Sequence, residues 1–238
     1  MSEPDWLHAT DPDTLLHFVR GKATDRQFRL YACGCCRRIW HLLRDARSRN
    51  LVEVAERYAD EPTDLALATL RDAREAGEQA ISRFAAHDGQ ADALAASVAA
   101  LGVAEANVAR GAAQVAERAA EAVSYYAVRQ RSWPDLDSAK KARLAAKGAE
   151  RAEQADLLRH IIGNPFRPAP TFRPWPAIVL PLAQALYRGE DCLFALHDAL
   201  LEAGCTEMAV HFAQEEHPKG CWLLDLIRFP PQATEAGS

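Results

Sequence analysis

Two groups of residues in this sequence have side chains and spacings that could bind a metal ion or react as thiols. The first lies near the C-terminus and consists of Cys205, His211, His217 and Cys221, separated by five, five and three residues. Four nitrogen or sulfur ligands are the number that a closed structural zinc site requires. These intervals match no standard zinc finger, so we favour ordinary core and capping contacts and keep zinc as the alternative.

The second group lies in the segment RLYACGCCRRIWHLL, residues 29–43, which contains Cys33, Cys35 and Cys36. At 100° per residue on a helix, all three fall within one wide apolar arc. Free cysteine behaves as a small hydrophobe, so we expect packed thiols on a buried helix face. The alternatives are a zinc ion shared by Cys33 and Cys36, redox chemistry at an exposed thiol near arginines, and a mixed site with the C-terminal group.

Basic residues are concentrated in one segment. Residues 20–49 hold nine basic and two acidic side chains, a net charge of +7, whereas the whole chain carries −5. Clustered arginines such as Arg37 and Arg38 could contact an external partner or the phosphates of a nucleic acid. We favour ion pairs with acidic residues elsewhere in the chain, including the C-terminal helices, because aromatic residues do not alternate with these arginines on an exposed face.

The composition is that of an ordinary globular protein, with 49% apolar and 26% charged residues in a chain of 238. No apolar run approaches the roughly 18 residues of a membrane span. The N-terminus, MSEPDWLHATDPD, lacks the basic region, apolar region and small-residue site that follow one another in a signal peptide. Six cysteines are too few for a disulfide scaffold, so we expect a cytoplasmic protein whose cysteines are thiols or metal ligands.

The segments that must position these residues all have sequence patterns typical of helices. No segment has the alternating apolar and polar residues of a strand, so we predict an all-α fold. Thr24 and Gln27 form a capping box for a helix over about residues 25–45. Ser48 is the expected N-cap of the next helix, which ends near Asp60.

The middle of the chain is rich in alanine, with 17 alanines among the 38 residues from Ala85 to Ala122. Small and apolar residues recur there every seven positions, which predicts a helix over about residues 91–131 that packs closely on its neighbours. Gly102 and Gly111 weaken this helix and are the positions for a bend or break. We expect residues 61–162 to form an up-down-up bundle of three helices.

The segment GNPFRPAPTFRPWP, residues 163–176, contains five prolines and must run as extended chain. Phe166, Phe172 and Trp175 are its candidate anchors to a surface or partner. Four short helices are expected between about residue 176 and residue 228, with Gly204 ending the second of them.

Three blocks of the sequence, CCRRIWHLL, GNPFRP and GCWLLDL, are similar to blocks of one protein family. The sequence over roughly residues 5–60 and 157–228 resembles a family of uncharacterised helical proteins expanded in planctomycete bacteria. The family carries no established activity. Its members usually have a cysteine directly after the residue that corresponds to His211, where this chain has Phe212, so a zinc ligand at that position would be missing here.

The resemblance also implies a domain organisation. Two specific end blocks around a variable middle imply that residues 1–60 and 163–238 fold together as a helical head. Residues 61–162 would then be an inserted antiparallel stalk.

No catalytic motif is present: neither G-x-S-x-G, a glycine-rich phosphate loop nor H-E-x-x-H occurs. The remaining histidines, such as His17, His41, His160 and His197, are scattered. We therefore predict a non-enzymatic interaction or scaffold protein with a protein partner or self-association through the alanine-rich helices. A metal- or thiol-dependent regulator or enzyme is the first alternative, and nucleic-acid binding through residues 20–49 is the second.

Overall fold

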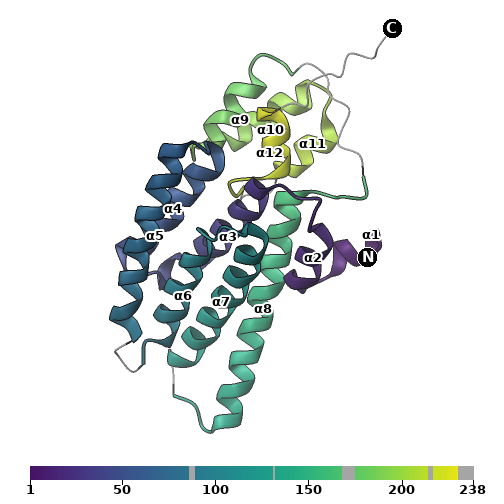
Figure 1. The fold of residues 1–238 in the computed structure, drawn as a ribbon. Coiled ribbons are helices and arrows are strands. Elements are labelled where there is room, and N and C mark those ends of the chain that lie inside the picture. The colour runs from purple at the N-terminus through teal and green to yellow at the C-terminus, as the bar shows by residue number, and fades with distance from the viewer. Residues whose placement is uncertain (86–88, 131, 168–174, 214–216, 230–238) are drawn as a thin grey trace. The chain divides into compact units, whose positions relative to one another are not determined.

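The computed structural model describes residues 1–238 apart from 86–88, 131, 168–174, 214–216 and 230–238 (Figure 1). All regular elements among the described residues are helices, which confirms the predicted all-α class. In chain order they are α1 (Glu3–His8), α2 (Pro12–Val19), α3 (Asp25–Arg38), the 3-10 helix η1 (Trp40–Leu42), α4 (Ala46–Asp60), α5 (Asp64–Ala85), α6 (Ala91–Gly102), α7 (Val108–Arg129), α8 (Leu136–Ile162), α9 (Val179–Tyr187), α10 (Leu193–Glu202), α11 (Thr206–His211) and α12 (Trp222–Arg228).

The chain forms two compact units, unit 1 over residues 1–159 and unit 2 over residues 160–238. This division differs from the expected one, because residues 1–60 group with the alanine-rich helices. The reason is that α3 packs against α4, α6 and α7, so the N-terminal block and the alanine-rich helices share one core. Packing of residues 1–60 on residues 163–238 stays a prediction.

Local capping explains where the first helices begin. The Thr24 hydroxyl accepts from the Gln27 amide at 3.2 Å, and the Gln27 side chain accepts from the Thr24 amide at 3.0 Å, as the capping box predicts. Helix α3 ends at Arg38 rather than near residue 45. The cap of α4 is Asp45, which accepts from the Arg47 amide at 2.9 Å, so the prediction of Ser48 was wrong and Ser48 lies buried inside α4.

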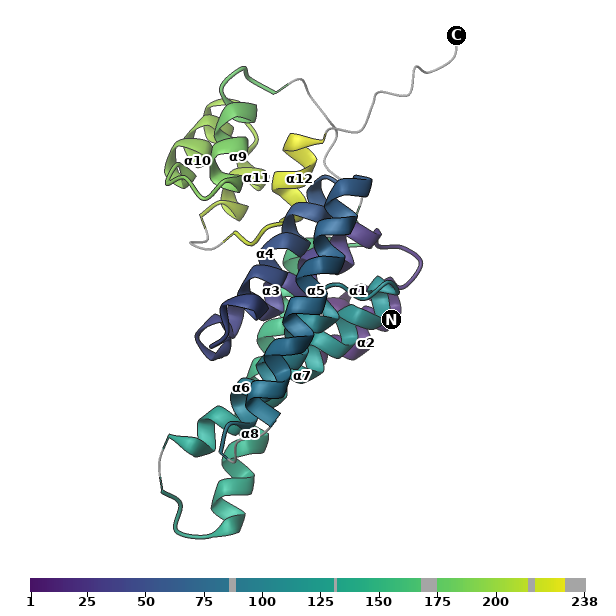
Figure 2. The same cartoon turned by 60° about the vertical axis from the view of Figure 1, so that its left-hand side comes forward.

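The sulfur-rich face of α3 is part of the core of unit 1. Cys33, Cys35 and Cys36 are each at most 1% exposed, and Tyr31 is buried with them. This is the arrangement expected from the apolar arc of the helix. The neighbouring helices α4 and α5 run side by side along unit 1 (Figures 1 and 2).

The alanine-rich segment folds back on itself. In place of one helix over residues 91–131, α6 and α7 pack against each other, and the break falls between Gly102 and Val108. Their buried faces consist largely of alanine, which lets the two backbones approach closely. The described part of residues 61–162 thus forms four helices, α5 to α8, where three were expected. Val115 and Ala122, two residues of the seven-residue repeat that we call the alanine-rich seam, are fully buried inside unit 1.

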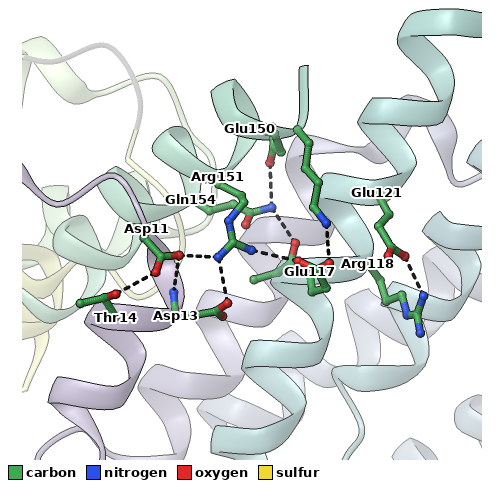
Figure 3. Close-up of polar contacts among 11 residues, drawn as sticks. Asp11, Asp13, Thr14, Glu117, Arg118, Glu121, Glu150, Arg151 and Gln154 are labelled. Atoms are coloured by element: carbon green, nitrogen blue, oxygen red, sulfur yellow. Dashed lines mark hydrogen bonds and ion pairs between the residues drawn. The ribbon is translucent and has the colours of Figure 1, made fainter. Parts of the chain in front are cut away.

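Charged side chains join α8 to the rest of unit 1 (Figure 3). The guanidinium of Arg151 donates to Asp11 and, at 2.8 Å, to Asp13 at the start of α2. It also donates at 2.9 Å to Glu117 of α7, whose other oxygen accepts from Lys147 at 2.5 Å. One arginine therefore links three helices that are distant in the sequence.

In unit 2, helices α9 to α12 enclose one apolar cluster, which we call the unit-2 core. Its buried members are Val179, Ala183, Leu196, Ala199, Leu200, Met208, Ala209, Phe212, Cys221, Leu223, Leu224 and Ile227. The four short helices expected from the sequence are present, and Gly204, with φ of +72°, follows the end of α10 as predicted.

We expect Gly111→Ala to destabilise unit 1. A Cβ atom at this position would lie 2.6 Å from the carbonyl oxygen of Gly102 and 2.8 Å from the Cβ of Glu105. Overpacking of this kind costs about 1–3 kcal/mol. The control is Gly148→Ala in α8, where a Cβ would meet nothing within 4 Å and should stabilise the helix by roughly 0.5–1 kcal/mol. Urea denaturation followed by circular dichroism measures the free energy of unfolding of both variants. Equal stability of the two would contradict the close approach of α6 and α7 at Gly111.

Candidate metal centre

Four side chains of unit 2 with nitrogen or sulfur donors converge on one point: His160, His211, His217 and Cys221. Their potential ligand atoms all lie within 4.8 Å of one another. Cys221 Sγ is 3.1 Å from His211 Nε2 and 3.8 Å from His217 Nδ1, and His160 Nε2 is 3.3 Å from His217 Nδ1.

These distances match the requirements of a tetrahedral zinc ion. Bonds of about 2.1 Å to nitrogen and 2.3 Å to sulfur separate two nitrogen ligands by about 3.4 Å, and nitrogen from sulfur by about 3.6 Å. The three measured separations fall within about half an ångström of these values. The other separations are at most 4.8 Å, so the side chains would have to move closer together to bind one such ion.

Three separate segments supply the four side chains. His160 lies in the last turn of α8. His211 is the last residue of α11, and Cys221 is the N-cap of α12, with His217 in the connection between them. Gly163, with φ of +77°, directs the chain away from α8, and a Cβ there would lie 3.1 Å from the ring of Trp222. The glycine therefore lets the indole pack beside the end of α8.

Burial controls the protonation of the cluster. It lowers the pKa of His160 to about 4 and that of His211 to about 3, and the positive charge that the neighbouring imidazoles would carry lowers both further. Both imidazoles are therefore neutral near pH 7 and can offer a lone pair. Burial raises the pKa of Cys221 to about 12, so a metal that binds its sulfur must displace a proton.

Aromatic rings surround the histidines. His211 makes edge contacts with Phe212 and Trp222, with ring centroids 5.4 Å and 5.7 Å apart. His217 lies 4.8 Å from the ring of Phe212. An apolar wall of this kind holds the imidazoles in place and limits access of water.

Three of the four residues predicted as zinc ligands from the sequence meet in this cluster, and Cys205 does not. Cys205 is the N-cap of α11, and its sulfur lies 3.8 Å from the carbonyl oxygen of Ala203. The sequence analysis missed His160, because 51 positions separate it from His211. Its place three positions before the start of the GNPFRP block was the available signal. Phe212 is 1% exposed and belongs to the unit-2 core.

The other cysteine group is structural. Burial raises the pKa of Cys33 and Cys36, and it raises that of Cys35 to about 12. Within the described part of the chain, neither Cys33 nor Cys36 belongs to a set of three or more metal-binding side chains.

The arginines of residues 20–49 pair inside unit 1. Arg37 makes two hydrogen bonds to Glu56, at 2.8 and 2.7 Å, and Arg38 makes two to Glu150, at 3.0 and 3.1 Å. Further pairs are Arg26–Asp60, Arg44–Asp92 and Arg47–Asp45. The acidic partners in these pairs come from unit 1. These internal bonds leave the guanidinium groups less free to contact phosphates.

The proposed aromatic anchors differ in burial. Trp175 is partly buried and packs against the unit-2 core, whereas Phe166 is 39% exposed. Phe172 lies outside the described residues. Trp175 is thus the anchor that the structure places on unit 2.

The chain matches no protein-family model, no curated protein and no solved structure. Of the described helices, none combines the length and the apolar character needed to cross a membrane. The geometry of the site is therefore the basis for the function argued below.

We expect Cys33, Cys35 and Cys36 to resist alkylation in the native protein at pH 8. Burial keeps each of them protonated and inaccessible, whereas Cys205 is half-buried and should react first. Peptide mapping by mass spectrometry after iodoacetamide treatment measures this order, and all six thiols should react in denaturant. Labelling of Cys33 as fast as Cys205 in native protein would contradict a closed core.

Proposed function

We propose that unit 2 is a zinc-binding helical module, with His160, His211, His217 and Cys221 as the ligands of one ion. The observation that carries the proposal is the convergence of four potential ligand atoms within 4.8 Å from three separate segments. Imidazole and thiolate donors suit zinc, whereas calcium and magnesium take oxygen ligands. Among the residues that the structure describes, the cluster contains no carboxylate, and this favours zinc over those ions.

The number of ligands favours a structural, non-enzymatic role. Catalytic zinc sites keep one coordination position open for water or substrate, and structural sites are closed by four protein ligands. Three imidazoles and one thiolate would fill a tetrahedral ion completely. The proposal combines the metal-dependent alternative of the sequence analysis with its leading, non-enzymatic hypothesis.

An interaction role with a protein partner is supported by exposed apolar side chains on unit 2. Phe194 is 79% exposed and Val210 is 64% exposed. Self-association through the alanine-rich seam is less supported, because Val115 and Ala122 are buried within unit 1. Nucleic-acid binding is also less supported, since Arg37 and Arg38 are engaged by glutamates. A cytoplasmic location is part of the proposal, because a reducing compartment keeps a thiol ligand available.

Metal analysis of the purified protein tests the proposal. We expect one zinc per chain in the wild type and in Cys205→Ser, whose sulfur lies outside the cluster. Cys221→Ser should weaken zinc binding by at least about tenfold, measured by competition with a chromophoric chelator, because it removes the thiolate ligand. Undetectable zinc binding by the wild type, or equal affinity of the two serine variants, would refute the proposal.

Cobalt substitution tests the geometry. Co²⁺ in a tetrahedral site should give intense visible d–d bands and a sulfur-to-cobalt charge-transfer band, because the cluster offers one thiolate and three imidazoles. Cys221→Ser should lose the charge-transfer band and Cys205→Ser should keep it. A weak octahedral spectrum in the wild type would be incompatible with a closed tetrahedral site.

A further inference from the structure

The helices of unit 2 lack the local stabilisation that those of unit 1 have. The N-cap residues of α9 to α12 are Ile178, Cys192, Cys205 and Cys221, and none of these described side chains makes a capping hydrogen bond. Isoleucine is among the poor N-caps, and the common ones are Ser, Thr, Asp and Asn. In the described part of unit 1, by contrast, seven helices have a capping side chain, from Ser2, Asp11, Thr24, Asp45, Thr63, Asn107 and Asp135.

Helix length adds to this difference. Helices α11 and α12, which flank the cluster, have six and seven residues. Isolated helices shorter than about 12–15 residues are marginal in water, so these two depend on tertiary contacts. In unit 1, α5 and α7 have 22 residues each.

Ion pairs in the two units also differ in how far apart their partners lie in the sequence. In unit 1, Arg38 pairs with Glu150 across 112 positions of the sequence, and Arg151 links α2, α7 and α8. In the described part of unit 2, Arg188 pairs with Glu190 and Arg228 with Asp225, which are two and three positions away. Such local pairs support single helices and do not hold separate helices together.

The potential metal ligands are interleaved with the unit-2 core. Phe212 follows His211 directly, and Leu223 and Leu224 lie two and three positions after Cys221. Cys221 itself is 0% exposed and counts among the core residues. Fixing these ligands around one ion would therefore also fix α11 and α12 against the rest of the core. Small units with limited cores commonly need a staple of this kind, such as a metal ion.

From these observations we infer that unit 2 folds only when its metal site is loaded, whereas unit 1 folds without metal. This inference rests on the proposed zinc site. Loss of zinc would then convert α11 and α12 to flexible chain and expose the apolar unit-2 core, without unfolding α3 or α7. Zinc availability would thereby control whether unit 2 presents a folded surface.

Hydrogen exchange of the full chain, measured by mass spectrometry with one equivalent of zinc and after chelation, tests the inference. Amides of α11 and α12 should exchange at least about 100-fold faster in the metal-free protein, the factor by which a ligand at 100 times its Kd suppresses the unfolded state. Amides of α3 and α7 should exchange equally in both samples. With zinc present, Cys205→Ser should behave as the loaded wild type and Cys221→Ser as the metal-free protein.

The comparison of the wild type with and without chelator does not depend on any variant, and zinc binding is measured on the same samples by calorimetry. Zinc binding with unchanged exchange in α11 and α12 would overturn the inference and leave the proposed function intact. Faster exchange in α3 and α7 as well would overturn the selectivity for unit 2. Absence of zinc binding would refute the proposed function, and the inference with it.

Discussion

In our proposal, the folding of unit 2 depends on how the polar groups of three imidazoles and one thiol find partners where they meet. His160, His211, His217 and Cys221 bring polar groups into a region where Cys221 is fully buried and the three imidazoles are half-buried. Buried polar groups are costly unless each has a partner. A single cation with nitrogen- and sulfur-binding preference would satisfy all four at once.

Unit 1 is held together by different means. Alanine faces on α6 and α7 allow close packing, and Gly102 and Gly111 remove the side chains that would block their crossing. Buried cysteines fill the core beside them, and arginines such as Arg38 and Arg151 connect distant helices through carboxylates. Apolar packing and ion pairs thus account for unit 1 without a metal ion.

The sequence predicted the features that depend on local chemistry. The capping box of Thr24 and Gln27, the buried face of α3 and the stop at Gly204 are properties of a few neighbouring residues. The heptad pattern was less informative, because small residues every seven positions suit both one long helix and two helices packed on each other. The fold-back between Gly102 and Val108 depends on tertiary contacts that no local pattern contains.

The candidate site was only partly predictable for the same reason. His211, His217 and Cys221 lie within eleven residues, so their spacing was visible. Proximity in the sequence favoured Cys205 as the fourth ligand, whereas the fold supplies His160 from the end of α8. A ligand so distant along the chain is set by the fold alone.

X-ray absorption at the zinc edge of the purified, zinc-loaded protein tests the central claim most directly, because it reports the atoms bound to the ion. The account predicts a four-coordinate shell with three nitrogen neighbours at about 2.0–2.1 Å and one sulfur at about 2.3 Å. A shell of five or six oxygen or nitrogen atoms without sulfur would contradict it.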